Sequence, residues 1–431
     1  MCNAEEAYRA LHPYVRRPGP ESELPILTPC DYHASTSPLV QILARGHHGV
    51  VLDADEWRRI YEWNDLNCPY WGHWRPKQYE TDRFAVACVD PIARRKELAE
   101  RYGGCTDDPE AEYAAYAAKV ASRSIVKMRP AKTAKSAKAA RAIPSMTPAA
   151  ACAAQLGHIT EEPNITVKTV DLGNGTSLVL RRIPAGLFTM GSDRGYPDEA
   201  PPRLAKVPRA FWISETEVRN DQYHAFDPSH DSRYQDQFGK DHVIPGYVGN
   251  HRRQPVVRVS WNEAQAFCCW LAAKSGLVVR LPTETEWEWA ARAGSATPFP
   301  WGGQDDDFSL YANLADRDVR WMNADGWLGG GAYILPRRAY RIAQNYPLHD
   351  ERWKDDWFTL NYVARALPNA WGLYDMHGNA AEWTASDYAP GRKTVKGGSF
   401  ASRPRDATSS WRWGYAPWQK VFDVGFRVVA E

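Results

Sequence analysis

The sequence has few cysteines, no long apolar run and almost no net charge, and each of these absences excludes a class of protein. Eight cysteines among 431 residues do not make the dense pattern of a small disulfide-stabilised secreted domain. No apolar stretch approaches the roughly 20 residues that cross a bilayer, and the first residues show no signal peptide. A formal net charge of +1 gives no global electrostatic case for a nucleic-acid or membrane partner. We therefore expect a cytoplasmic protein, with exposure on a virion or a cell surface as the alternative.

Tryptophan, in contrast, is abundant, with 19 residues that lie mostly in the second half of the chain. Such large amphipathic rings are favoured in a fold that has little regular structure, and also on surfaces that bind ligands. Composition alone leaves both interpretations open.

A change of composition predicts a domain boundary. Residues 119–141 contain eight basic and no acidic residues, and an Ala- and Pro-rich stretch follows. This composition is typical of a linker, which we place at 119–164 between a small mixed N-terminal domain (1–118) and a C-terminal domain (165–431). Alternation typical of strands begins in ITVKTVDL (165–172). The basic run is most simply a solvated tether, with nucleic-acid binding as the alternative.

The N-terminal region contains thiol and imidazole side chains that could bind zinc. Their spacing matches no zinc-finger pattern, so loop and core residues, or a partner-docking module, are the alternatives. An amphipathic stretch, 54–63, predicts a helix on which Trp57, Ile60 and Tyr61 share a face. The zinc candidates are Cys30, His33, His47, His48, Cys68 and His73.

Two S/T-x-x-E capping boxes predict two helices in the C-terminal region. The first box begins at Ser260 and the second at Thr283. Ala264, Phe267, Cys268 and Leu271 follow the first box with helical spacing, which makes Cys268 a core residue. We expect the first helix to end at Gly276 and the second at Gly294.

Seven short motifs then follow one another in a specific order. They are IPAGLFTMGS (183–192), EVRN (217–220), PVVRVSW (255–261), RLPTE (280–284), WGLYDMHGN (371–379), GGSF (397–400) and GFR (425–427). In this order they resemble the formylglycine-generating enzyme (sulfatase-modifying factor) family over roughly residues 170–431. The resemblance implies an irregular α+β fold related to the C-type lectin fold, with a ligand groove formed largely by the C-terminal segment. It does not cover the N-terminal region.

Active members of this family bind copper(I) through a cysteine pair that follows the G-G-S motif. The matching positions here are Ser402 and Ala407, and no cysteine follows Cys269. Because copper(I) requires soft thiolate ligands, we expect no copper and no catalytic residue. Ser399 matches the family's active-site serine, but a serine without a histidine base is a weak nucleophile, so a structural role in a Gly-rich turn is the simpler interpretation.

Another branch of the family, the ergothioneine-synthase type, binds iron through an H-x3-H-x-E motif in an N-terminal helical bundle. Residues 1–165 contain no such motif. An iron-dependent oxidase therefore has no visible ligand set.

The resemblance also implies two structural calcium sites. Both sets contain only oxygen ligands, which suit a hard cation such as calcium. Surface or capping acids are the alternative for each set. The first set is Asn313, the carbonyl of Leu314, Asp355 and the carbonyl of Trp357, and the second is Asp375, the carbonyls of Gly378 and Ala380, and Glu382.

The segment after the G-G-S motif would line the groove. Its Trp, Tyr and Arg side chains supply large rigid contact areas and planar donors for a protein, peptide or carbohydrate ligand, although its tryptophans could equally fill the core. The segment also resembles in position the variable region of proteins diversified by retroelements. The candidate ligand-binding residues are Ser399, Ser402, Arg403, Arg405, Trp411, Arg412, Trp413, Tyr415 and Trp418.

These observations favour a calcium-stabilised ligand-binding or protein-binding module that has lost the oxidase chemistry. The alternative is an oxidoreductase of the same family that acts on a peptide or sulfur-containing substrate with a metal site free of cysteine.

Overall fold

The computed structural model describes residues 10–11, 14–16, 32–46, 49–66, 158–159, 166–235, 247–318 and 348–431, with a few single positions between 96 and 118. Contacts divide the chain into one unit of Met1–Cys68 with Thr147–Glu431 and a second unit of Pro69–Met146. The described residues between 10 and 66 thus group with the C-terminal region, whereas we expected residues 1–118 to form one domain. The expected linker, 119–164, lies outside the described residues except for two positions.

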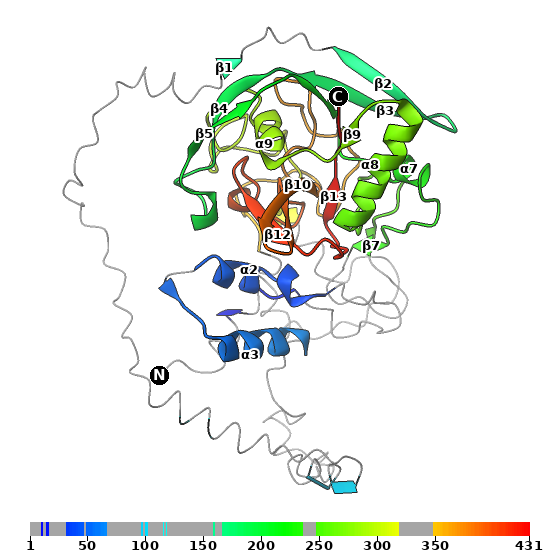
Figure 1. The fold of residues 1–431 in the computed structure, drawn as a ribbon. Helices are drawn as coiled ribbons and strands as arrows, with labels where there is room; N and C mark the ends of the chain where they lie inside the picture. The colour runs from blue at the N-terminus through cyan, green and yellow to red at the C-terminus, as the bar shows by residue number, and fades with distance from the viewer. Residues whose placement is uncertain are drawn as a thin grey trace, which may run out of the picture. The chain divides into compact units, whose positions relative to one another are not determined.

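The strands of the described residues are short and form four sheets (Figure 1). The largest has the order β2-β3-β6-β14-β9, and a four-stranded sheet has the order β12-β11-β10-β13, in which β10 and β13 are parallel. Smaller sheets have the orders β1-β4-β5 and β7-β8. The strands are β1 (His158–Ile159), β2 (Val167–Gly173), β3 (Thr176–Ile183), β4 (Gly186–Met190), β5 (Arg203–Val207), β6 (Phe211–Ser214), β7 (Tyr234–Gln235), β8 (Tyr247–Val248), β9 (Val279–Arg280), β10 (Ala381–Ala389), β11 (Arg392–Lys396), β12 (Arg412–Tyr415), β13 (Val424–Phe426) and β14 (Val429–Ala430).

Both helices predicted from capping boxes are confirmed. Ser260 caps α8 (Trp261–Ser275), which ends at Gly276 in the left-handed conformation that glycine accepts without strain. Thr283 caps α9 (Glu284–Arg292), which ends one residue before the predicted Gly294 because Ala293 takes the left-handed position. Further helices within the described residues include α2 (Pro38–Ala44), α3 (Ala54–Asp65) and α7 (Asn220–His224), with 3-10 turns η3 (Ala34–Thr36), η6 (Pro197–Glu199) and η9 (Pro404–Asp406).

Tryptophan rings fill the core between these short elements. Trp287, Trp289, Trp383 and Trp413 are fully buried. Their indole N–H groups need acceptors once water is removed. Trp289 donates to the carbonyl of Pro184 at 2.8 Å, and Trp383 donates to the carbonyl of Val259 at 2.8 Å. These side chains therefore link loops to the core. The fold is the irregular α+β type that the sequence predicts.

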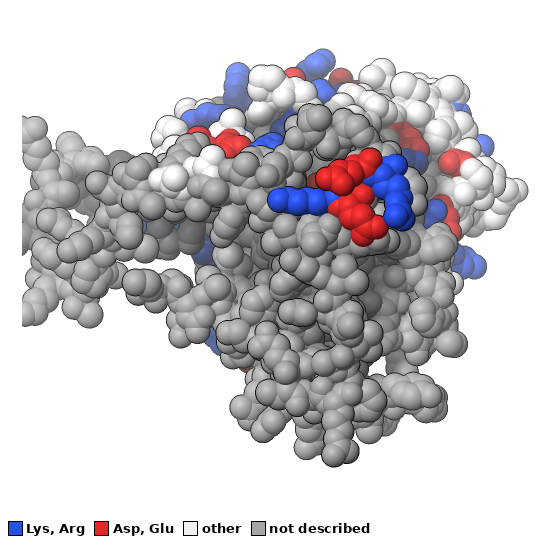
Figure 2. Space-filling view, turned by 90° about the horizontal axis from the view of Figure 1, so that it is seen from below, with Lys and Arg blue, Asp and Glu red and all other residues white. Residues whose placement is uncertain are grey.

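The N-terminal helices form a small cluster of their own. Val15 and Leu39 are buried against Leu43 and Trp63. The outer face of α3 carries ion pairs, with Arg58 3.1 Å from both Asp55 and Glu62. Figure 2, seen from the side of α3, shows acidic and basic side chains interleaved among atoms that are not described. A helix face with mixed charges of this kind is typically exposed to solvent. Among the described residues, every helix is too short or too polar to cross a membrane.

Candidate functional site

Three aspartates from two distant loops converge on one point. One carboxylate oxygen from each of Asp316, Asp318 and Asp355 lies within 4.8 Å of the others, and among the described residues this is the group of three potential metal ligands that the structure brings together. Asp316 accepts hydrogen bonds from the backbone N–H groups of Asp318, at 2.7 Å, and of Asp355. Lys354 lies 3.6 Å from Asp318 at the outer side. We call these three residues the aspartate cluster.

The carboxylates of the aspartate cluster are buried close to one another, and Lys354 offsets part of the charge at Asp318. Burial raises the pKa of Asp355 to about 8, and the negative charge of Asp316 adds to this effect. Burial likewise raises the pKa of Asp316 to about 6. A divalent cation would remove this repulsion, because carboxylates that ligate a cation gain more from its charge than they lose by burial.

The first expected calcium set lies at this cluster. The backbone N–H groups of Leu314 and Trp357 donate to Asp355 at 3.0 and 2.8 Å. Asn313 donates to the carbonyl of Thr359 at 2.8 Å, while its buried Oδ1 accepts no hydrogen bond from the part of the chain that the structure describes. Sequence reasoning missed Asp316 and Asp318. The signal that could have found them is the run Asn313-x-x-Asp316-x-Asp318, because oxygen side chains at such short intervals are typical of calcium loops.

The second expected set has a different arrangement. Glu382 is buried and uses both carboxylate oxygens in a two-point ion pair with Arg427, at 2.7 Å each. Asp375 is also buried and accepts from the backbone N–H of Ala364 at 2.6 Å. Burial and the nearby charge of Asp375 raise the pKa of Glu217 well above its usual range. Here a protein cation, Arg427, already balances part of the acidic charge. The backbone carbonyl groups of Gly378 and Ala380 lie in the same loop as Asp375, and this loop leads into β10.

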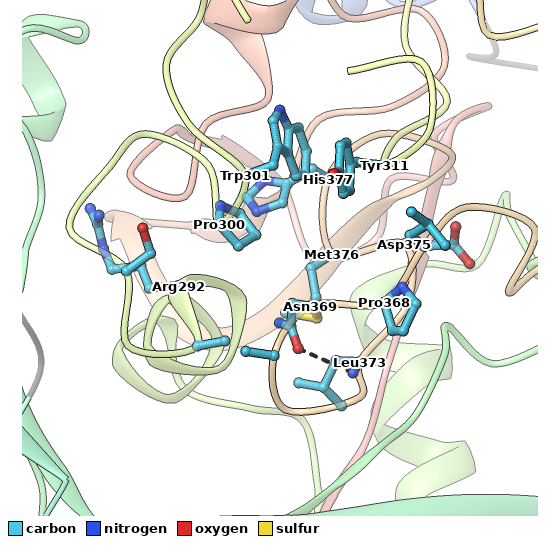
Figure 3. A pocket seen from close by; sticks show the side chains of 14 residues that line it. Arg292, Pro300, Trp301, Tyr311, Pro368, Asn369, Leu373, Asp375, Met376 and His377 are labelled. Atoms are coloured by element: carbon cyan, nitrogen blue, oxygen red, sulfur yellow. Dashed lines mark hydrogen bonds between the residues drawn. The ribbon is translucent and has the colours of Figure 1, made fainter. Parts of the chain in front are cut away.

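A pocket of about 250 Å³ lies beside this loop. Figure 3 shows Trp301, His377 and Tyr311 together at one side of it, with Asn369 and Met376 at the other. The Trp301 ring stacks on Tyr311 with centroids 5.2 Å apart and an interplanar angle of 10°. The pocket therefore has an aromatic wall and few charged groups.

His377 of this wall is a fixed neutral imidazole. Its Nδ1 lies 2.8 Å from the carbonyl oxygen of Ala407, which can only accept, so Nδ1 carries the proton. Burial lowers the pKa of His377 to about 4, which keeps the ring uncharged at neutral pH. This hydrogen bond fixes the backbone at Ala407, one of the two positions at which the resemblance implies a copper-binding cysteine. Sequence reasoning gave no role to His377.

The two positions of the implied cysteine pair lie in contrasting surroundings. Ala407 is fully buried among Phe299, Phe308 and Leu314. The Ser402 hydroxyl accepts from the backbone N–H of Ser399 at 3.0 Å. Neither side chain can supply the soft ligand that copper(I) prefers.

Several candidate ligand-binding residues are interior residues. Ser399 is buried and donates to Asp423 at 2.6 Å, so it is a structural residue of the turn. Trp411, Trp413 and Tyr415 are 6%, 1% and 5% exposed and belong to the main core cluster, which agrees with the alternative that such rings fill the core and not with rings that line a groove. Their rings are large enough to fill space between short strands, and that packing prevails over surface display.

The remaining candidates are more accessible. Arg412 is half-buried and forms an ion pair with Glu284, in which its Nε and Nη2 lie 2.8 and 2.9 Å from the two carboxylate oxygens. Arg405 is exposed and lies over the Tyr196 ring at 4.6 Å. Trp418 is 54% exposed. Ser402 and Arg403 are half-buried, and Arg403 lies 3.6 Å from Asp406.

Comparisons with known proteins find relatives of this chain. The inactive C-alpha-formylglycine-generating enzyme 2 of Bos taurus is 27% identical over 310 residues, which cover 60% of this chain and 90% of that protein. The formylglycine-generating enzyme of Mycobacterium tuberculosis is 28% identical over 259 residues, which cover 48% of this chain and 74% of that protein.

Similar solved structures include PvdO from Pseudomonas aeruginosa. It has a TM-score of 0.46 and 25% identity, over 63% of this chain and 100% of that chain. Treponema denticola variable protein 1 has a TM-score of 0.45 and 20% identity over 62% of this chain and 99% of that chain. Residues 175–431, more than half of the sequence, match the sulfatase-modifying factor enzyme 1-like domain. The chain therefore belongs to the sulfatase-modifying factor enzyme 1-like, or formylglycine-generating enzyme-like, family.

Proposed function

We propose that this chain is a calcium-stabilised member of the family that binds a ligand and does not oxidise cysteine. The observation that carries the proposal is the pair Ser402 and Ala407 at the positions of the implied copper ligands. Without thiolates at these positions, copper(I) has no soft ligands in the segment that would hold it. A relative whose name calls it inactive aligns with 60% of this chain, which supports a family branch without the oxidase activity.

The aspartate cluster supports the choice of calcium. The group of three potential metal ligands that forms among the described residues consists of carboxylates alone, and Asn313 of the same loop as Asp316 offers a neutral Oδ1 that accepts no hydrogen bond from the described residues. Hard oxygen ligands in flexible loops suit calcium. We assign the first site to Asp316, Asp318, Asp355 and Asn313, where the ion would tie together two loops that lack regular hydrogen-bonded structure.

The second set fits calcium less well. Arg427 already neutralises Glu382, and a divalent cation placed between Glu382 and Asp375 would have to compete with a buried guanidinium. The first site is therefore the stronger candidate.

The accessible residues of the C-terminal segment support a protein, peptide or carbohydrate ligand. Arg405 and Trp418 present a planar cation and a large ring on the surface, which are residue types that dominate binding energy at interfaces. A segment diversified by a retroelement would use the same surface. Comparing this segment among independently isolated copies of the gene tests that finer proposal, and changes confined to codons of exposed residues are expected.

Elemental analysis of the purified chain tests the proposal directly. Stoichiometric calcium without copper or iron is the expected result, together with a melting temperature that falls when a chelator is added. Stoichiometric copper or iron with oxygen uptake in the presence of a thiol peptide would instead establish the alternative, an oxidoreductase with an unfamiliar metal site.

A further inference from the structure

The end of α2 places one side chain in an aromatic cage. Arg45 follows α2, and its side chain is 4% exposed. Its guanidinium lies over three rings, at 4.2 Å from the centroid of Tyr196, 4.8 Å from Trp413 and 5.4 Å from Trp411. Asp198 lies 3.7 Å from its Nε. We call Tyr196, Asp198, Trp411 and Trp413 the arginine cage.

The arginine cage has the chemistry of a guanidinium site. Aromatic faces attract a cation most strongly where water is excluded, and a carboxylate at the edge balances its charge. The Arg45 Nη2 also donates to the carbonyl oxygen of Arg412 in β12. A planar guanidinium can stack on several rings and donate in its own plane at the same time, whereas an ammonium group cannot.

Other side chains also join the N-terminal segment to the C-terminal domain, among them Arg16, whose guanidinium lies 3.7 Å from the centroid of the Phe422 ring. Gln41 donates to the hydroxyl of Tyr415 at 3.1 Å, and Gln419 donates to the hydroxyl of Ser35 at 3.1 Å. The ring of His33 meets that of the exposed Trp418 edge to face at 6.0 Å. These contacts fall on the C-terminal segment that was expected to bind a ligand.

The two parts do not share a hydrophobic core within the described residues. Val15 and Leu39 form the N-terminal cluster, while Trp411, Trp413 and Tyr415 belong to the main cluster of the C-terminal domain. An interface held by polar and cation–π contacts, without a common core, resembles reversible interfaces between domains.

We infer that the arginine cage is the anchor site for a peptide or protein ligand that presents an arginine, and that residues 32–46 occupy this site within the same chain. This inference rests on the proposed binding function and names its ligand class. An external ligand must displace α2, so the N-terminal segment limits access to the site.

A labelled peptide of residues 32–46 tests this inference by fluorescence anisotropy. The receptor is the full chain with Gln41→Ala and Arg45→Ala, which weakens the internal occupant and leaves the cage intact. We expect it to bind the peptide at least about tenfold more tightly than the wild-type chain, because the internal segment competes at high effective concentration. The same peptide with Arg45→Lys should bind about tenfold more weakly, and with Arg45→Ala about 30-fold more weakly, through loss of the guanidinium contacts.

Arg58→Ala in the full chain is the matched control, since it removes an arginine from the solvated face of α3, and it should bind the peptide as the wild type does. A folded double variant that binds no peptide, or binds all three peptides equally, overturns the inference. Hydrogen exchange of the wild-type chain gives a second measurement that needs no variant. Excess peptide should accelerate exchange in α2 and leave α8 unchanged, and unchanged exchange in α2 would contradict the inference. None of these measurements depends on calcium or on oxygen uptake. If the chain proved to be a copper-dependent oxidase, the proposed function would be refuted, but the peptide affinities would be unchanged.

Discussion

Arg427 and Glu382 form a two-point ion pair in the interior of the C-terminal domain, with both nitrogen–oxygen distances at 2.7 Å. Trp287 adds a third contact, since its indole N–H donates to Glu382 at 2.6 Å. The carboxyl groups of Glu217 and Asp375 lie in the same electrostatic environment, so Arg427 offsets more than one acidic group. Replacing this arginine leaves buried acids without a counter-charge.

We expect Arg427→Met to lower the free energy of unfolding by about 3–5 kcal/mol, the range for breaking a buried pair. Urea titration followed by tryptophan fluorescence measures this loss. The double variant Glu382→Gln/Arg427→Met should lose less than the sum of the single variants, because neither charge is then stranded. A loss below about 1 kcal/mol for Arg427→Met would show that water or another group compensates Glu382.

Calcium should raise the melting temperature of the wild-type chain, and Asp316→Asn should remove most of that increase. The asparagine keeps the side-chain volume but removes one of the charges that would hold the ion. Asp193→Asn, at an exposed position outside the aspartate cluster, is the control and should keep the full increase. Differential scanning fluorimetry with calcium or with a chelator measures the effect, and an equal response of both variants argues against this site.

The calcium effect should grow between about pH 5 and pH 8. Without the ion, the raised pKa values of Asp316, about 6, and Asp355, about 8, make the folded state hold protons that the unfolded state has released. The stability that these protonated groups contribute is complete below their ordinary pKa of 3.8 and is lost as the pH rises through the folded values. Calcium replaces the protons, so the difference in melting temperature with and without calcium should widen as the pH rises. A difference that is constant over this range would contradict the linkage.

His377 should make the chain less stable in mild acid. Its folded pKa of about 4 lies below the ordinary value of 6.5, so its contribution is complete above pH 6.5 and is lost as the pH falls toward 4. We expect about 3 kcal/mol over this window, as an order of magnitude. His377→Gln can keep a hydrogen bond to Ala407 without titrating, so its unfolding free energy should vary less between these pH values. Chemical denaturation at pH 4.5 and pH 7 compares the two chains, and parallel pH profiles would exclude His377 as the source.

The helix caps should contribute measurably to the free energy of unfolding. Ser260→Ala removes the acceptor for the backbone N–H of Glu263 and should cost about 1 kcal/mol of unfolding free energy. Ser260→Asp restores an acceptor at the same position and should recover most of that loss. If Ser260→Asp is as unstable as Ser260→Ala, the cost arises from packing instead of capping.

The local structure of this chain could be predicted because its signals lie within single segments. The boxes at Ser260 and Thr283 bind backbone groups three residues away, and Gly276 ends its helix through its own dihedral angles. Such short-range hydrogen bonds do not depend on the path of the rest of the chain. The order of the seven motifs likewise indicated the family, and the identities at positions 402 and 407 are visible in the sequence alone.

The aspartate cluster, the buried rings and the arginine cage were decided only by the tertiary structure. Asp355 contacts Asp316 although 39 residues separate them along the chain, and the sequence does not give the path between them. Trp413 is of a residue type that is common at binding surfaces, yet in this fold its ring fills space in the core between short strands. Arg45 reaches this ring from the opposite end of the chain. Amino-acid type determines which interactions a residue can make, but burial and charge compensation are properties of neighbours that folding brings together.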